Sequence, residues 1–241
     1  MSITVNAVVG TDTGEASYAA SGTVTNSANI TTAVGDVVFV HHFYAPVSFA
    51  LISCTVSGGT GGYTAGTGIT SAFSNVAAQH FYRVSTAAET FKVTTTLATA
   101  ALTRKIVVAV LRSSTGTLSF SSSSGFQQSF DAPANPGTNT VTSQSVPNNS
   151  IIIFGAQLAQ PTITGAGTGY TASANGADTG YAIYQTNATA TSTSPVFTTD
   201  STAYRALIGG FVFYDTPPAV TIYEFQSFSR GIGRGIARGI A

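Results

Sequence analysis

The chain has 241 residues, of which only 7% are charged and 43% are hydrophobic, and its formal net charge is zero. A neutral chain has no overall field that would steer it toward nucleic acid or an anionic membrane, so the composition predicts neither partner. Few charges and no net charge favour association. We therefore expect much of the surface to be covered by neighbouring subunits in an assembly. A hydrated serine and threonine surface on a monomer is the alternative.

The N-terminal stretch MSITVNAVVGTDTGE lacks the basic region and apolar run of a signal peptide, and no apolar run is long enough to span a bilayer. The single cysteine, Cys54, excludes an intrachain disulfide. Cys54 lies in the stretch ALISCTVSGG, which is typical of a strand, so we expect a buried and inert thiol.

Strand patterns follow one another along the whole chain. The stretch 91–97 alternates between apolar and polar residues, which is typical of a strand with one face in water. Four other stretches are continuously apolar, rich in β-branched and aromatic residues and about eight residues long. They are VVFVHHFY (37–44), KIVVAVLR (105–112), SIIIFGAQL (150–158) and ALIGGFVFY (206–214). No stretch combines a helical period with helix-forming residues, so the sequence predicts an all-β protein.

The second half of the chain resembles the first. GDVVFV, GGTGGYTAGTG and RKIVVAVLRS are followed by NNSIIIFG, GAGTGYTASANG and RALIGGFVFYD, and an arginine precedes each last strand, Arg104 and Arg205. The tetrad GYTA occurs at 62–65 and at 169–172. We interpret residues of about 30–115 and 145–215 as two half repeats; chance similarity in so biased a composition is the alternative.

Two four-stranded, Greek-key-like halves predict one eight-stranded antiparallel jelly-roll β-sandwich over residues 1–218. Two separate small domains are the less favoured arrangement. The segment between the halves contains Phe120, Phe126 and Phe130, which a free linker would not need.

No residue pattern predicts catalysis, a metal or a cofactor. Nine carboxylates are scattered, mostly beside turn-forming residues, and the sequence does not show whether two of them face each other across a cleft. His41 and His42 are neighbours in a strand, so their side chains point to opposite faces, and His80 is the only other histidine. The glycine-rich loops lack the lysine and the following helix of a phosphate site. We expect them to form tight turns.

The same loops carry Tyr63 and Tyr170, which would offer stacking faces to a saccharide. We keep glycan binding through Tyr63 and Tyr170 as an alternative function. Each tyrosine could equally cap the core.

The last twelve residues read RGIGRGIARGIA and follow the pair Pro217 and Pro218, which end the last strand. Four glycines would cost a helix about 4 kcal/mol relative to alanine, so we expect residues 219–241 to be extended. One face of such a strand carries alternating positive charge and apolar bulk: Arg230, Ile232, Arg234, Ile236, Arg238 and Ile240. We predict that this tail docks on a neighbouring protein; a disordered basic tail is the alternative.

The patterns AVGDVVFV…GYTA…RKIVVAVL and VPNNSIIIFG…GYTA…RALIGGFVF resemble the jelly-roll surface proteins of tailed-bacteriophage virions, such as capsid decoration proteins, head fibres and tail-associated domains. The resemblance covers residues of about 30 to 215 and carries over no functional residues. It implies a non-enzymatic, homo-oligomeric structural protein on the virion surface, whose partners are other capsid or tail subunits. Assembly in a host cytoplasm would need no export signal.

Overall fold

The computed structural model describes twelve segments of the chain: residues 3–12, 22–26, 28–46, 53–70, 76–98, 101–114, 117–122, 125–130, 137–158, 163–174, 181–199 and 206–216. In these segments the chain forms 22 strands and no helix. All the paired strands run antiparallel. The predicted all-β class is therefore confirmed. Within the described part, no helix is long and apolar enough to cross a membrane.

The first half of the chain builds a six-stranded sheet in the order β1-β11-β4-β8-β6, with β7 also paired to β8. Its strands are β1 (Ile3–Asp12), β4 (Val37–Pro46), β6 (Thr64–Ala65), β7 (Ile69–Thr70), β8 (Ala77–Val84) and β11 (Ala101–Ser113). Every residue from Val37 to Tyr44 is at most 1% exposed. The continuous apolar run of β4 thus belongs to a strand that is covered on both faces.

The second half builds a six-stranded sheet in the order β12-β22-β16-β19-β18, with β13 also paired to β22. Its strands are β12 (Thr117–Phe120), β13 (Phe126–Phe130), β16 (Ser150–Leu158), β18 (Thr171–Ala174), β19 (Tyr181–Asn187) and β22 (Ala206–Thr216). Phe126 of the segment between the halves packs in the core of the second half.

Each half also has smaller sheets. The order β2-β10-β5 in the first half is matched by β14-β21-β17 in the second, and the pair β3-β9 by the pair β15-β20. In the first half these strands are β2 (Gly22–Thr25), β3 (Ile30–Thr32), β5 (Cys54–Ser57), β9 (Glu89–Phe91) and β10 (Thr94–Leu97). In the second half they are β14 (Gly137–Thr140), β15 (Gln144–Val146), β17 (Ile163–Ala166), β20 (Thr191–Thr193) and β21 (Val196–Thr199).

The pairing in both halves is nested, first strand with last. In the first half β1 pairs with β11, β2 with β10, β3 with β9 and β4 with β8. In the second half β12 and β13 pair with β22, β14 with β21, β15 with β20 and β16 with β19. In each half, the earlier strands therefore pair with the later ones in reverse order, as in the two arms of a long hairpin. The successive pairs belong to different sheets.

The two GYTA tetrads occupy the same position in this pattern. Thr64 of the first tetrad pairs with Tyr82, and Thr171 of the second pairs with Tyr184. Across the next strands, Tyr82 lies opposite Phe39 and Tyr184 opposite Ile153. One strand further, Phe39 lies opposite Ala109, and Ile153 opposite Phe211. These registers define which positions of the two halves match.

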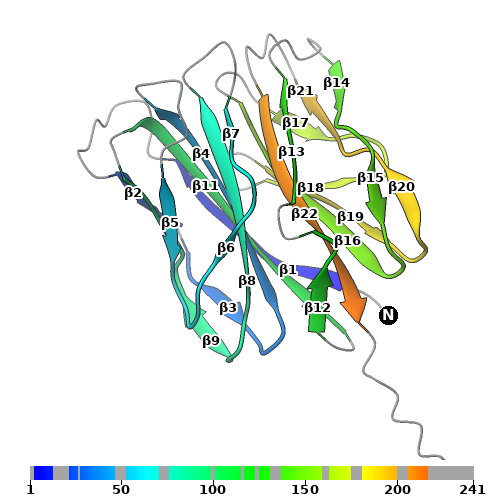
Figure 1. Cartoon of the computed structure of the whole chain (residues 1–241), viewed down its shortest axis with the longest axis horizontal. Helices are drawn as coiled ribbons and strands as arrows, with labels where there is room; N and C mark the ends of the chain where they lie inside the picture. The colour runs from blue at the N-terminus through cyan, green and yellow to red at the C-terminus, as the bar shows by residue number, and fades with distance from the viewer. Residues whose placement is uncertain are drawn as a thin grey trace, which may run out of the picture.

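The four main sheets stack in four layers, with the first half on the left of Figure 1 and the second half on the right. One face of the first six-stranded sheet packs on β2, β3 and the chain next to β9 through a core that includes Val24, Ile30 and Val93. Its other face packs on the second six-stranded sheet; Phe39 and Tyr82 meet Phe211 there. We call this contact between the two six-stranded sheets the central interface.

The expected single eight-stranded sandwich is not confirmed. Each half contains its own six-stranded sheet and its own three-stranded sheet. The reason is physical: β4, β11, β16 and β22 are apolar on both faces, and such strands need a covering layer on each side.

Candidate functional site

A polar cluster of the first half surrounds Arg83 of β8, whose side chain is 2% exposed. Arg83 Nη2 lies 2.7 Å from Glu89 Oε1, and Nη1 donates to the Thr60 carbonyl at 2.5 Å. The Thr60 amide donates to Glu89 Oε2 at 2.7 Å. One buried guanidinium therefore ties the loop after β5 to strand β9.

Two aromatic rings flank the same guanidinium. Arg83 Cζ lies 5.4 Å from the ring centre of Tyr63 and 4.7 Å from that of Phe91, which are cation–π distances. The Tyr63 hydroxyl donates to the Gly58 carbonyl at 3.2 Å. Burial raises the pKa of Tyr63 to about 12, against the opposing charge of Arg83. The ring and hydroxyl of Tyr63 are thus engaged inside the first half.

The glycine-rich loop closes over this ion pair. Gly59 has a φ of 68°, and a Cβ there would collide with the guanidinium of Arg83 and the carboxylate of Glu89. Glycine is needed at this position for both reasons. The loop acts as a tight turn on the cluster, as expected from its composition.

Desolvation opposes ionisation of Glu89, but the hydrogen bonds from Thr60 and Arg83 and the positive charge of Arg83 outweigh it and lower the pKa of this carboxyl. Glu89 is therefore held ionised as a structural counter-ion.

The second half repeats this cluster without charge. Gln185 follows Tyr184 as Arg83 follows Tyr82, so the two positions match. The Tyr170 hydroxyl lies 2.7 Å from Thr193 Oγ1, and Thr193 donates to Gln185 Oε1 at 2.9 Å. The Tyr170 ring packs on Phe154, with centroids 6.1 Å apart. Burial raises the pKa of Tyr170.

The two predicted glycan-binding residues, Tyr63 and Tyr170, therefore lie at matching places, and each hydroxyl is bonded within its own half. Both rings are half-buried. Saccharide binding through them stays a prediction.

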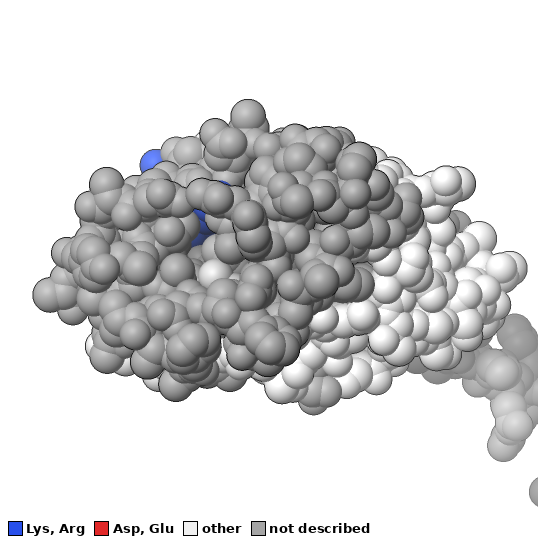
Figure 2. All heavy atoms as spheres, turned by 90° about the horizontal axis from the view of Figure 1, so that it is seen from above, with Lys and Arg blue, Asp and Glu red and all other residues white. Residues whose placement is uncertain are grey.

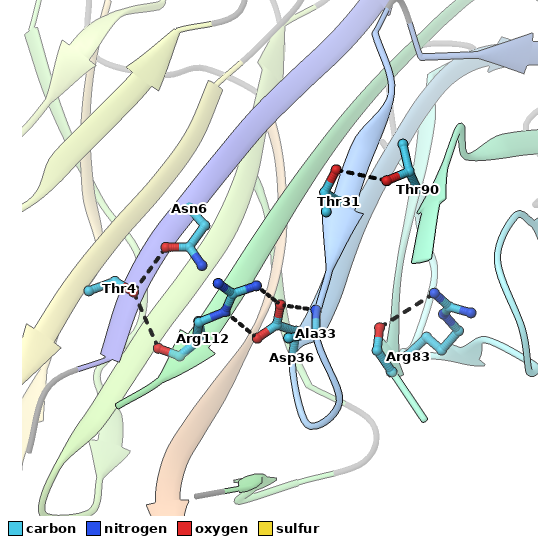
Figure 3. A network of polar contacts seen from close by, with 9 residues as sticks. Thr4, Asn6, Thr31, Ala33, Asp36, Arg83, Thr90 and Arg112 are labelled. Carbon is cyan, nitrogen blue, oxygen red and sulfur yellow. Dashed lines mark hydrogen bonds and ion pairs between the residues drawn. The ribbon is translucent and has the colours of Figure 1, made fainter. Parts of the chain in front are cut away.

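A second ion pair braces the turn between β3 and β4 (Figure 3). Arg112 Nε and Nη2 donate to the two oxygens of Asp36 at 2.8 and 2.6 Å, and the Ala33 amide donates to Asp36 Oδ2 at 2.8 Å. Asp36 is 2% exposed. Hydrogen bonding to Asp36 raises the pKa of Arg112. This bidentate contact fixes the turn to strand β11.

The carboxylates whose side chains are described are all bound to structural partners. Asp36 binds Arg112, Glu89 binds Arg83, and Asp215 accepts a hydrogen bond from Ser113. Among the residues that the structure describes, no three His, Cys, Asp or Glu side chains are grouped so that they could hold a metal ion.

The structure shows which histidines lie together, which the sequence alone does not show. His41 and His42 point to opposite faces of β4, as expected, but His41 lies directly opposite His80 on β8, so these two share the central interface. His42 faces the other way, with Nδ1 3.2 Å from Cys54 Sγ. Burial raises the pKa of the Cys54 thiol to about 12. Only the pairing of β4 with β8, which is remote in sequence, brings His41 and His80 together.

The outer face of the sheet β2-β10-β5 carries hydroxyl groups in register. Thr94 lies between Thr25 and Ser57, and Thr96 lies between Thr23 and Thr55. In the view of Figure 2, basic side chains of the described residues show only as small patches and acidic ones are not seen.

The predicted docking residues of the tail (Arg230, Ile232, Arg234, Ile236, Arg238 and Ile240) lie outside the described residues. Comparison of the chain with protein-family models, with characterised proteins and with solved structures gives no match.

Proposed function

We propose that the protein is a non-enzymatic structural component of a virion surface, such as a capsid decoration, head-fibre or tail-associated protein. One observation carries the proposal: the side chains best suited to chemistry are used inside the fold. The three histidines are at most 1% exposed, the Cys54 thiol has a raised pKa, and the described carboxylates brace turns and strands. The outer face of the β2-β10-β5 sheet presents hydroxyl groups. Such a protein supplies a surface and a scaffold.

The fold part of the proposal is that the nested pairing of each half is a jelly-roll arrangement. A jelly roll has two packed sheets built from Greek-key connections. The support is that first and last strands pair in both halves, with a six-stranded sheet and a three-stranded sheet in each beside a two-stranded one.

The anchoring part concerns residues 219–241. The alternating arginines and isoleucines suit an extended segment that lies along a neighbouring subunit, with arginine on carboxylates or carbonyls and isoleucine in apolar contact. The zero net charge of the whole chain supports close packing of copies in a homo-oligomer.

The test is a truncation after Ser229 in the full chain, compared with a length-matched variant in which Arg230, Arg234 and Arg238 are alanine. Far-UV circular dichroism and thermal unfolding should match those of the intact chain, because the described strands end at Thr216. Incorporation into particles, measured by the protein's copy number in purified virions, should be lost on truncation. Full occupancy by the truncated protein would overturn the proposal.

Glycan binding is the alternative function, and a specific observation keeps it: Tyr63 and Tyr170 occupy matching loops of the two halves. A signal on a broad glycan array that is lost in Tyr63→Ala or Tyr170→Ala would favour it. Silence across the array would count against it.

A further inference from the structure

His41 and His80 lie side by side in the middle of the central interface. They are directly opposite each other on β4 and β8, and they are 0% and 1% exposed. The His80 ring lies 4.7 Å from that of Phe211 on β22, which belongs to the second half. Neither ring nitrogen of His41 has a hydrogen-bond partner among the described residues. The pair therefore sits where the two halves of the chain meet.

Glycines of the second half make room for both rings. A Cβ at Gly155 on β16 would collide with the His41 ring, and a Cβ at Gly209 on β22 would collide with the His80 ring. Since Phe39 matches Ile153, His41 matches Gly155 two residues further on. At this pair of matching positions, the first half thus contributes the large side chain of His41, and the second half contributes the space left by Gly155. The fit leaves little space for a water molecule or counter-ion beside these rings.

Other titratable groups lie on this face of the two six-stranded sheets. They are Tyr82 on β8, Lys105 on β11, Tyr184 on β19 and Asp215 on β22, whereas the described side chains of β4, β6, β7, β13 and β16 contribute no further titratable group to this face. On β1, Asp12 lies opposite Lys105 in the register and so belongs to the same face. Lys105 carries the same sign of charge as a protonated histidine. Asp215, the one carboxylate whose side chain is described on this face, is six residues along β22 from Gly209, about 20 Å at the usual rise of a strand.

We infer that the central interface is an acid-sensitive joint, in which protonation of His41 and His80 separates the two halves of the chain while the sheets of each half stay folded. This inference concerns the central interface and does not depend on the proposed virion role. A proton on His41 places a charge among packed apolar side chains, where neither ring nitrogen has a hydrogen-bond partner among the described residues, and that state is costly until water enters.

The electrostatics agree with the geometry. Burial, and then the charges that His80 and His42 would carry, lower the pKa of His41 well below its ordinary value. The folded state therefore binds fewer protons than the separated state, where the pKa is about 6.5. The stabilisation of the interface is complete above about pH 6.5 and is lost progressively as the pH falls below it.

The joint opens between the halves because each half keeps its own core. Val24, Ile30 and Val93 stay packed against the far face of the first six-stranded sheet, and Val141, Val146 and Phe197 against that of the second. The backbone hydrogen bonds run within sheets of one half, with no sheet shared between halves among the described strands. Separation exposes apolar side chains without breaking a strand pair.

The experiment is a pH titration of the full chain from 7.5 to 4. ANS fluorescence reports exposed apolar surface, small-angle X-ray scattering reports separation, and amide hydrogen exchange of β4 and β16 reports whether the sheets persist. We expect ANS fluorescence and the radius of gyration to rise together below about pH 6, with amide protection retained. The imidazole NMR signals of His41 and His80 should change from neutral to charged at the same pH.

The matched variants are His41→Gln with His80→Gln, which remove both titrating groups, and His42→Gln on the opposite face of β4. The double variant should lose the acid transition or shift its midpoint down by more than one pH unit, and His42→Gln should retain it. An unchanged transition in the double variant overturns the inference. So does the absence of a transition in the wild-type chain, or a loss of amide protection in step with ANS binding. If the double variant fails to fold, the histidine NMR titration of the wild type decides alone: protonation of His41 or His80 without separation overturns the inference.

Discussion

Ser113 donates a hydrogen bond to Asp215 Oδ1 at 2.8 Å, and the two residues occupy matching positions of β11 and β22. The match follows from the register, since Ala109 corresponds to Phe211 and each of the two residues lies four positions further on. His41 and Gly155 also match and also touch. Contacts between matching positions are those of an isologous, two-fold interface. The two halves therefore meet as the subunits of a homodimer would, within one chain.

This relationship predicts an energetic coupling across the central interface. In a double-mutant cycle, Ser113→Ala and Asp215→Ala should show a coupling energy of about 0.5–3 kcal/mol in urea unfolding at pH 7. The control cycle pairs Ser113→Ala with Thr25→Ala on the outer face, which should be additive. Additivity of Ser113→Ala with Asp215→Ala would show that the contact does not join the halves.

The fit of His41 against Gly155 predicts that a single methyl group is costly there. Gly155→Ala should destabilise the fold by about 1–3 kcal/mol, because the ring must move within a packed interface. In a His41→Ala background, the cost of Gly155→Ala should be smaller, since the methyl group then has space. The control is Gly62→Ala, where a Cβ would meet nothing within 4 Å. If thermal unfolding shows equal costs for Gly155→Ala and Gly62→Ala, the predicted packing is wrong.

The matching clusters at Arg83 and Gln185 predict that the charged cluster of the first half can be replaced by an uncharged one like that of the second half. Arg83→Gln should lower the free energy of unfolding, because it leaves the Glu89 carboxylate without its buried partner. The double variant Arg83→Gln with Glu89→Thr removes both charges, as in the uncharged cluster of the second half, and should be destabilised less than Arg83→Gln alone. Chemical unfolding of both variants measures this. A double variant that is less stable than the single one would contradict the correspondence.

The lowered pKa of Glu89 predicts an acid-labile contribution to stability. A depressed carboxyl pKa means that the folded state binds fewer protons. The contribution is therefore present above the unfolded value of about 4.3 and is lost as the pH falls through the folded value. Glu89→Gln should flatten the decline of the unfolding temperature below about pH 4.5. An unchanged pH profile in Glu89→Gln would exclude this role.

The environment of Cys54 predicts an unreactive thiol. Burial raises its pKa to about 12, so the thiolate that reacts with disulfide reagents is scarce at pH 8. A thiol-specific chromogenic reagent should label the native protein far more slowly than the urea-unfolded protein. A Cys54→Ser variant provides the blank. Labelling of native and unfolded chains at similar rates would show that the thiol is accessible.

Much of the local structure follows from residue patterns. The runs 37–44 and 150–158 are apolar at both odd and even positions, which predicts strands covered on both faces, and they become β4 and β16. The recurrence of GYTA predicts a relation between the halves, and the two tetrads do lie in the same place of the same pairing order. Alternation and turn composition are local properties, so a sequence shows them directly.

The candidate sites were less accessible to sequence reasoning. Tyr63 and Tyr170 look like loop aromatics, but their hydroxyl partners come from a loop glycine and from Thr193 of another strand. Arg83 and Glu89 look like surface charges, although the guanidinium is buried. The spacing of six residues between them was the available signal, but it does not show that a loop closes over the pair.

By itself, the sequence predicted that this chain forms strands and indicated that its two halves are alike, and it determined that few residues are charged. Only the tertiary structure decided that each half builds its own six-stranded and three-stranded sheets and that the halves meet through the apolar faces of β4, β11, β16 and β22. An apolar run states that a strand must be covered but does not state by which partner, because burial is non-directional. The contact between the halves joins residues that are more than a hundred positions apart, such as Ser113 and Asp215. It places His41 and His80 at the central interface.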